Sequence, residues 1–541
     1  MIARVTLALL CCMFAANART LRVPEQFTFI QTAIDSSQSG DTILIEPAIY
    51  PEALVIVDRS LTLAGTAPPD SANGIGVVID PTSLPLANEL ACLEIHGGDS
   101  VKLRNLWFRN GEAMHEDRQT DDPGGIDNSH GLLRLALSNC RFDSVYACIR
   151  RGVVVELDSV VMFNSQRRCI SRGDSGRVLA SNCRFHGAVT NIMVSAWSGS
   201  TFASCSFTNL LNGWLLSAGQ DSITVLDCDF GPFYGACDPA ILIRAGSGSV
   251  IAGNVFHDFE IGDAVLEINQ ADCETVTDPS FRHPLVIGNR FEHIGPGDCQ
   301  EGVALRIKCD GDVPAFLGSY EDNVFTHVTS LGYFGNAMSV HRGAAMIEHN
   351  VFANAGPDSC GAVYVLGVEP PEILLLRRNA FDSLAFGVQH ASDDEFTDAR
   401  LNWWGDATGP FNLTSNPNGL GAAVDDDVLF SPWLLVPPDS SDTNEVAVEL
   451  PPLGPDEYLL SAFPNPFNGT TTLNITVAVH CSYMIMLYDI TGRLVQTAFE
   501  GVVAHSQDVT LDLRNLPSGL YFAQLRSASR PLSTAKLLLL K

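Results

Sequence analysis

The chain has 541 residues, with 62 Asp and Glu against 32 Lys and Arg, which gives a formal net charge of −30. Such an acidic surface repels nucleic acid and anionic lipid, so we expect no nucleic-acid partner, whereas divalent cations and neutral or cationic partners fit it. Apart from the amino terminus, no apolar run approaches the roughly 20 residues that span a bilayer, and the sequence predicts no transmembrane segment.

The first 18 residues have the pattern of a secretory signal peptide. Arg4 precedes an apolar stretch from Val5 to Ala16, and Ala16-Asn-Ala18 supplies the small residues of a cleavage site. Leu10 precedes Cys11 where a lipoprotein signal needs a small residue, so no lipid anchor is expected. The sequence therefore predicts export and removal of residues 1–18.

A short pattern recurs between residues 140 and 404: Asn or Cys, one residue, then an aromatic residue. Its copies are Cys140/Phe142, Cys183/Phe185, Cys205/Phe207, Cys228/Phe230, Asn254/Phe256, Asn289/Phe291, Asn323/Phe325, Asn350/Phe352, Asn379/Phe381 and Asn402/Trp404, and Phe163 fits the aromatic series. The shortest separations are near 22 residues. Short β-branched runs between Gly, Asn, Asp and Ser at this period predict a unit of about three strands, stacked many times.

Such units predict the coils of a parallel β-helix, in which each strand pairs with its equivalent one coil later. Equivalent residues then lie about 4.8 Å apart, so Asn should form an amide ladder and Phe a column of stacked rings. Across residues 21–433 the chain resembles the right-handed parallel β-helix superfamily, the pectin-lyase-like fold. Residues 29–52 resemble its opening, where a short amphipathic helix caps the core. The resemblance implies an all-β fold and no particular activity, because this fold hosts lyases, hydrolases, esterases and adhesins alike.

The cysteines follow the same repeat. Two of the 15 leave with the signal peptide, and the remaining number is odd. Cys183, Cys205 and Cys228 occupy the position that Asn holds in later coils, and Cys148 and Cys169 match in another column. Parallel side chains on successive coils are poor geometry for a disulfide, so we expect buried free thiols.

The strand after each aromatic residue predicts two rows of outward-facing polar side chains, because alternation turns its apolar centre inward. A sugar chain could lie across these rows, with Tyr364 stacking on a ring and Arg or Lys holding a uronate carboxylate. Solvent-facing salt bridges are the alternative. The first row is Glu267, Arg306, Ser339 and Tyr364, and the second is Arg244, Asn269, Lys308, His341 and Gln389.

In a polysaccharide lyase, a base removes the proton next to a carboxylate that a cation neutralises. Lys308, His341 and Arg306 are the candidates for these catalytic roles. Arg306-Ile-Lys308 matches a tripeptide of polygalacturonases, but the other elements of that family are absent. The segment Ala48–Glu52 resembles the start of pectin methylesterases, whose later catalytic motifs are also absent.

Two upstream groups are further candidates. Arg151 and Arg172 occupy matching positions in successive coils, where two like charges could bind an anion or simply face solvent. A long acidic segment with Asp121, Asp122 and Asp127 could hold Ca²⁺, although its spacing matches no EF-hand and an acidic loop is the alternative.

The composition changes after Trp433. Residues 434–457 are rich in Pro, Ser and acidic residues, which is typical of a linker, and residues 458–541 predict a small antiparallel sandwich. The motifs Phe463-Pro-Asn-Pro-Phe-Asn468, Leu487–Val495 and Leu516–Phe522 resemble those of the C-terminal sorting domain of the type IX (Por) secretion system. This resemblance implies recognition by an outer-membrane translocon, followed by anchoring at the cell surface or release.

The sequence thus predicts an exported cell-surface protein that binds extracellular polysaccharide. Its expected parts are a signal peptide (1–18), a β-helix (19–433), a linker (434–457) and a sorting domain (458–541). The alternative is a polysaccharide lyase or glycoside hydrolase acting on uronate-containing chains. Binding is favoured because no complete catalytic motif is present.

Overall fold

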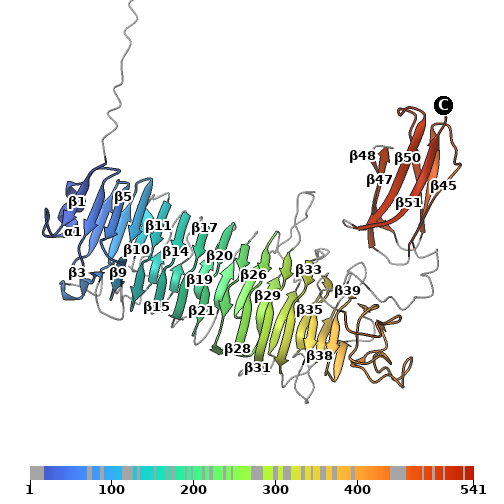
Figure 1. Ribbon diagram of the computed structural model, residues 1–541, viewed down its shortest axis with the longest axis horizontal. Coiled ribbons are helices and arrows are strands. Elements are labelled where there is room, and N and C mark those ends of the chain that lie inside the picture. The colour runs from blue at the N-terminus through green and yellow to red at the C-terminus, as the bar shows by residue number, and fades with distance from the viewer. Residues whose placement is uncertain are drawn as a thin grey trace, which may run out of the picture. The chain divides into compact units, whose positions relative to one another are not determined.

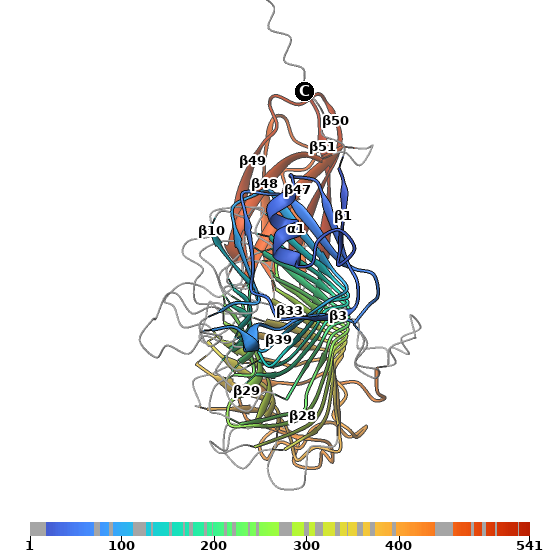
Figure 2. The ribbon, with the colours of Figure 1, turned by 90° about the vertical axis from the view of Figure 1, so that its left-hand side faces the viewer.

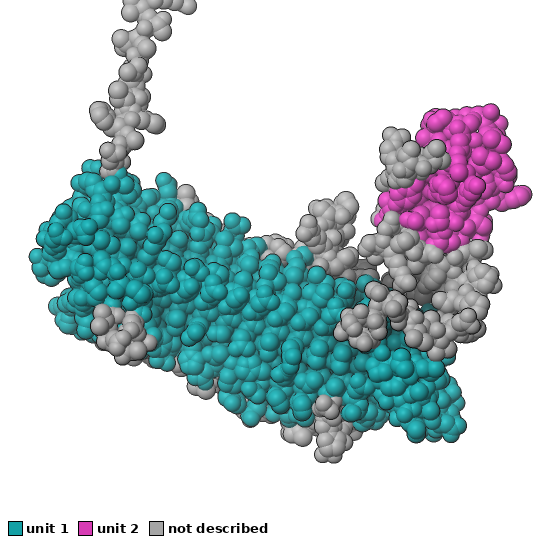
Figure 3. Space-filling view, viewed as in Figure 1, with its two compact units in different colours: residues 1–368, 374–438 teal, residues 369–373, 439–541 magenta. Residues whose placement is uncertain are grey.

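The structure is a computed structural model in which the chain forms two compact units (Figure 3). The first unit ends at Pro438, and the second consists mainly of Asp439–Lys541. The structure describes residues 18–69, 76–85, 90–111, 126–130, 134–145, 147–150, 154–165, 168–171, 177–188, 192–196, 199–209, 214–218, 223–235, 239–244, 248–269, 284–296, 302–308, 318–329, 336–342, 345–353, 361–367, 374–391, 397–438, 458–477, 481–489, 494–503, 506–527 and 530–541.

The first unit winds through three parallel sheets, A, B and C, each of which receives a strand from successive coils (Figure 1). Sheet A contains β1 (Thr20–Val23), β2 (Thr42–Ile45), β5 (Leu61–Gly65), β8 (Ser100–Arg104), β11 (Arg134–Ser138), β14 (Val154–Asp158), β17 (Arg177–Ser181), β20 (Ser200–Ala203), β23 (Ile223–Leu226), β27 (Val250–Ala252), β30 (Leu285–Ile287), β33 (Gly318–Glu321), β36 (Ala345–Glu348), β39 (Leu374–Arg377), β42 (Thr397–Asp398) and β44 (Val428–Leu429).

Sheets B and C follow the same order along the stack. Sheet B contains β3 (Ala48–Tyr50), β6 (Val77–Ile79), β9 (Leu106–Arg109), β12 (Arg141–Asp143), β15 (Val161–Ser165), β18 (Arg184–Ala188), β21 (Ser206–Thr208), β24 (Asp229–Phe230), β25 (Phe233–Gly235), β28 (Val255–Ile261), β31 (Arg290–Pro296), β34 (Val324–Val328), β37 (Val351–Ala353) and β40 (Ala380–Asp382). Sheet C contains β4 (Leu54–Val57), β7 (Leu93–His96), β10 (Ile126–His130), β13 (Ala147–Arg150), β16 (Arg168–Ser171), β19 (Ile192–Ala196), β22 (Trp214–Ala218), β26 (Ile241–Arg244), β29 (Ala264–Asn269), β32 (Val303–Lys308), β35 (Asn336–His341), β38 (Gly361–Leu366), β41 (Phe386–His390) and β43 (Ala423–Val424). The predicted parallel β-helix is confirmed.

The repeated pattern builds the core between the sheets. Adjacent rings of the aromatic column stack with centroids 4.6 to 5.2 Å apart. Six fully buried asparagines form the predicted amide ladder, in which each Nδ2 donates to the Oδ1 of the next at 2.9 to 3.0 Å. They are Asn254, Asn289, Asn323, Asn350, Asn379 and Asn402.

The assignment of Phe163 to the aromatic column is wrong. Met162 pairs with Phe142 on one side and with Phe185 on the other, so Met162 fills the column and Phe163 lies on the outer side of β15. Val160 and Met162 are fully buried and take the places that Cys and Phe hold in the pattern. The residue in the aromatic column is therefore Met162, one position before the predicted Phe163. The column also extends upstream to Phe108, which pairs with Phe142.

The predicted helical cap is α1 (Ile30–Ser36), which buries Ile30, Ala33 and Ile34 at the amino-terminal end of the stack (Figure 2). Phe29, at its N-cap, has no side chain that can accept the first amide protons. The carboxylate of Glu52 does so instead, accepting from the backbone N–H groups of Ile30 and Gln31 at 2.9 Å each. This carboxylate replaces a local N-cap and also suits the positive end of the helix.

Six cysteines whose side chains the structure describes in the first unit are free and buried: Cys92, Cys140, Cys169, Cys183, Cys205 and Cys228. Burial raises the pKa of Cys92 and Cys140 to about 12, so these thiols stay protonated at neutral pH. The hydrogen bond to Cys205, together with burial, also raises the pKa of Cys183 and Cys228.

We therefore expect a thiol reagent to react with few groups in the native mature protein and with nearly all its cysteines after unfolding without reductant. Burial blocks the reagent at every one of these thiols, and the raised pKa of Cys92, Cys140, Cys183 and Cys228 also keeps those four protonated. Cys205, whose pKa the hydrogen bonds from Cys183 and Cys228 lower to about 4, is protected by burial alone. Titration with a chromogenic disulfide before and after denaturation measures both numbers. Near-zero reactivity of the unfolded protein would show disulfides instead of free thiols.

The second unit is the predicted antiparallel sandwich. One sheet contains β45 (Tyr458–Phe463), β46 (Thr470–Val477) and β49 (Ser506–Asp512), and the other contains β48 (Leu494–Val503), β47 (Cys481–Asp489), β50 (Gly519–Ser527) and β51 (Arg530–Leu539). Asn465 ties the Pro-Asn-Pro turn to β51, because its Nδ2 donates to the carbonyl of Lys536 at 2.6 Å and its Oδ1 accepts from the N–H of Leu538 at 2.9 Å. No helix in the described part of either unit is long and apolar enough to cross a bilayer.

Candidate functional site

The two predicted rows lie on neighbouring strands of sheet C, from β26 to β41. In the second row, Arg244 pairs with Asn269, Asn269 with Lys308, and Lys308 with His341. In the first row, Glu267 pairs with Arg306, Arg306 with Ser339, and Ser339 with Tyr364. The coil-to-coil register of these residues agrees with the prediction.

Gln389 lies in a different row from the predicted one. It pairs with Tyr364 and therefore continues the first row, two residues away from the expected register. Val388 pairs with Val363, whereas the sequence alignment matched it with Val365. Either alignment turns Val388 inward, so alternation alone could not distinguish them.

The expected exposure of the first row is wrong. Glu267, Arg306 and Tyr364 are only 5%, 7% and 8% exposed, and Ser339 is fully buried. The Arg306 guanidinium forms an ion pair with Asp263, and its Nη1 lies 3.5 Å from Oε2 of Glu267. The charge of Arg306 is therefore balanced by the carboxylates of Asp263 and Glu267. The Tyr364 ring is too buried to stack against a sugar.

The second row remains partly open to solvent. Asn269, Lys308 and His341 are all half-buried and follow one another at the spacing of one coil, about 4.8 Å. The imidazole of His341 hydrogen-bonds through Nε2 with the hydroxyl of Ser339, which fixes the direction of the ring. The row thus presents an amide, an ammonium group and an oriented imidazole on a rigid sheet.

Several predicted site residues cannot be placed in this way. Arg151, Arg172, Asp121 and Asp122 lie outside the described residues, and for Asp127 and Arg244 the description covers the strand but not the side chain. Among the residues that are described, no group of three or more His, Cys, Asp or Glu side chains is arranged to hold a metal ion. The Ca²⁺ hypothesis stays a prediction.

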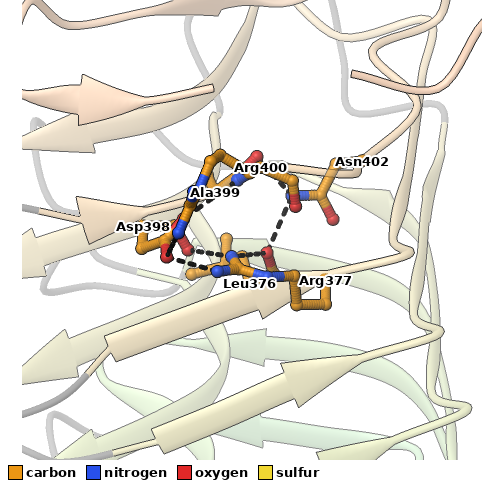
Figure 4. Close-up of polar contacts among 6 residues, drawn as sticks. All are labelled: Leu376, Arg377, Asp398, Ala399, Arg400 and Asn402. Atoms are coloured by element: carbon orange, nitrogen blue, oxygen red, sulfur yellow. Dashed lines mark hydrogen bonds and ion pairs between the residues drawn. The ribbon is translucent and has the colours of Figure 1, made fainter. Parts of the chain in front are cut away.

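A buried ion cluster near the end of the stack was missed by the sequence reasoning (Figure 4). Asp398, on β42, is 5% exposed and lies between Arg377 and Arg400. Arg400 Nη2 is 3.0 Å from Oδ2 of Asp398, and Arg377 Nη1 donates to the Asp398 carbonyl at 2.8 Å. Burial alone would raise the pKa of Asp398, but the hydrogen bonds from Arg400 and Arg377 outweigh it and hold that pKa below its ordinary value. Because both guanidinium groups are held by the Asp398 carboxylate and Arg377 reaches from β39 to β42, the cluster has a structural role in holding these two strands together.

We expect the stability of the first unit to fall at acid pH partly through Asp398. A carboxyl whose folded-state pKa is lowered contributes stability that is present above its ordinary pKa near 3.8 and is lost as the pH falls through the folded-state value. Asp398→Asn should remove this contribution and cost about 2 kcal/mol at neutral pH, because two guanidinium groups lose a charged partner. Urea unfolding at neutral and acid pH measures both effects.

Asp406→Asn is the control, since its lowered pKa comes from Thr408 and involves no arginine. Equal pH dependence of the wild-type and Asp398→Asn proteins would contradict the assignment.

Comparison with known proteins adds one family assignment. Residues 461–540 match the family model described as the secretion system C-terminal sorting domain. No curated protein matches the chain.

The chain also matches several solved structures, all at low sequence identity. A mannuronic acid specific polysaccharide family 6 lyase from human gut microbiota is 13% identical, with a TM-score of 0.32, over 71% of this chain and 86% of that one. Pectin methylesterase PemA from Erwinia chrysanthemi is 14% identical, with a TM-score of 0.18, over 57% and 79%. The Dettilon tailspike protein is 12% identical, with a TM-score of 0.23, over 64% and 68%.

The sorting domain directs a protein through the type IX secretion system to the cell surface or the extracellular space. The chain is therefore an exported parallel β-helix protein whose last residues belong to the family of secretion system C-terminal sorting domains.

Proposed function

We propose that the exported β-helix binds an acidic extracellular polysaccharide along the second row of sheet C. The observation that carries this proposal is the row itself: Asn269, Lys308 and His341 follow one another in register on adjacent coils and remain partly accessible. Lys308 supplies a cation for a carboxylate, and the amide and imidazole supply hydrogen bonds for sugar hydroxyl groups.

The rigidity of the sheet supports binding over many sugar units. The strands that carry the row are paired on both sides, so their side chains need little reordering when a ligand binds. The Lys308 ammonium group also favours this row, because the net charge of −30 repels an acidic polymer from most of the surface of the chain.

Titration calorimetry of the mature protein with an oligogalacturonate tests the proposal. We expect Lys308→Gln to weaken binding about tenfold, which corresponds to the loss of one charge-assisted hydrogen bond. Affinity for the wild-type protein should also fall as salt is added.

Lys102→Gln, an exposed lysine on β8 of sheet A, is the matched control and should leave the affinity unchanged. Equal affinities of the wild-type and Lys308→Gln proteins would refute binding at this row.

A polysaccharide lyase is the second candidate function, because Lys308 and His341 pair directly between β32 and β35. One of the two groups could remove the proton next to a uronate carboxylate while the other neutralises its charge. Arg306 is left out of this candidate pair, since it is buried and ion-paired.

Absorbance of unsaturated products and the appearance of reducing ends distinguish the two functions. Turnover that His341→Ala abolishes would establish a lyase. Saturable binding without any product would leave binding as the function.

A further inference from the structure

An arginine on the outer face of sheet B is enclosed by two aromatic rings. The Arg141 guanidinium, on β12, lies 4.6 Å from the ring centroid of Trp107, on β9, and 4.0 Å from that of Phe163, on β15. Trp107 is 9% exposed, whereas Arg141 and Phe163 are half-buried. Both rings lie within cation–π distance of the guanidinium and its Nε is buried, so the terminal Nη groups are the part that can meet a ligand.

Many arginines of the described chain form ion pairs with carboxylates, and Arg141 does not. The ion-paired arginines include Arg19 with Asp41, Arg109 with Asp80, Arg134 with Glu156, Arg290 with Glu292, Arg306 with Asp263, Arg377 and Arg400 with Asp398, and Arg514 with Asp512. Within the described residues, no carboxylate forms an ion pair with Arg141, and its Nε has no hydrogen-bond partner. The charge of Arg141 is therefore not neutralised by a contacting acid.

The surroundings of Arg141 add positive charge. Val161 pairs with Arg141 on one side and with exposed Arg184 on the other, which puts the two arginines two coils, or roughly 10 Å, apart.

Asp143, two residues along β12, attracts Arg141 electrostatically without forming an ion pair with it, and its Oδ1 accepts hydrogen bonds from Ser144 at 2.9 Å and Asn164 at 3.4 Å. Asp80 is ion-paired with Arg109 at 2.8 Å.

We propose that Trp107, Arg141, Phe163 and Arg184 form a second binding site, the sheet B site, for an anionic saccharide. The Nη N–H groups of Arg141 bind a carboxylate or sulfate of the sugar, Arg184 binds a second acidic group further along the chain, and the edge of Phe163 packs against the sugar ring. An aromatic surface beside a cation suits an acidic sugar better than a bare anion, because a bare anion has no apolar face for the ring. This site lies on a different sheet from the Lys308 row and does not depend on it.

The test uses the mature protein with Lys308→Gln, in which the sheet C row is already altered. Titration calorimetry with an oligogalacturonate, a sulfated dextran, a neutral maltohexaose and inorganic sulfate separates a carboxylated sugar, a sulfated sugar, a neutral sugar and a bare anion. In this background, Arg141→Gln and Arg184→Gln should each weaken binding of an acidic saccharide about tenfold. Arg134→Gln, which removes a half-exposed arginine of sheet A, should have no effect.

Each outcome decides the proposal. Loss of affinity with Arg184→Gln and unchanged thermal unfolding supports it, because Arg184 is exposed and its loss leaves the fold intact. Equal affinity of the three arginine variants overturns it, as does binding of inorganic sulfate as tight as that of the saccharide. Unfolding of Arg141→Gln alone, with Arg184→Gln binding normally, assigns the ring-enclosed arginine a structural role and also overturns the proposal.

Discussion

Deletion of residues 458–541 is expected to abolish delivery to the cell surface and to trap the remaining chain in the periplasm. The deleted segment contains the whole sorting domain, residues 461–540, that the secretion system recognises. The β-helix has its own core and forms a separate compact unit, so we expect it to fold without the sandwich. The effect should therefore be nearly all-or-none on export and small on folding.

Cell fractionation and protease accessibility on intact cells measure this result. A matched control removes residues 440–450, which precede the sorting domain, and should leave surface delivery unchanged. Asn465→Ala tests a smaller change in the sorting domain, because it removes only the two side-chain hydrogen bonds that join the Pro-Asn-Pro turn to β51. Normal surface display of the 458–541 deletion would contradict the role of the sandwich.

Replacement of Asn323 by Leu is expected to produce the largest loss of stability among single substitutions considered for the β-helix. The Oδ1 of Asn323 accepts from the backbone N–H and Nδ2 of Asn289, and its Nδ2 donates to the Val286 carbonyl and to Oδ1 of Asn350. All four contacts are buried, so leucine leaves several polar groups without partners, at a total cost of about 4 kcal/mol or more.

Urea unfolding, followed by circular dichroism, measures the change in free energy. Thr326→Ala, on the outer side of β34, the strand that follows Asn323, should cost less than about 1 kcal/mol. Asn323→Cys should lie between the two, because Cys228 occupies the same ladder position and its thiol donates to backbone carbonyls of its own coil and the previous one. A midpoint for Asn323→Leu equal to that of Thr326→Ala would show that the ladder is not stabilising.

The stack was predictable from sequence because its core repeats. One buried asparagine and one buried aromatic residue per coil set both the period and the strand register, so the pairing of Glu267 with Arg306 and of Lys308 with His341 followed directly. The prediction of Phe163 failed where Val160 and Met162 replace the usual pair. Because both pattern positions hold ordinary apolar residues in this coil, the sequence does not mark which residue enters the column. The register is then determined by packing against the neighbouring coils, which only the structure shows.

The candidate site was less predictable. The alternation of apolar and polar residues along a strand predicts which side of the sheet a residue faces, but it does not predict which other residues cover that side. Arg306 and Tyr364 face the predicted side of sheet C but are buried there. Arg141 was overlooked because Phe163 had been assigned to the core. A signal was present in the sequence, because Trp107 and Phe163 flank Arg141 at coil spacing on the outer side of sheet B.

The asparagine ladder has a direction. Each side-chain amide from Asn254 to Asn379 donates to the Oδ1 of the next asparagine toward the carboxyl terminus and also to a backbone carbonyl of the preceding coil. Asn402 ends the series, because its amide donates to the backbone carbonyls of Leu376 and Ala399. The amide dipoles therefore point the same way and polarise one another, as hydrogen bonds in a chain do. A coil that forms beside an already ordered coil meets an aligned hydrogen-bond acceptor and donor. The asparagine ladder therefore favours growth of the stack by addition of coils to an existing end over independent formation of coils in the middle.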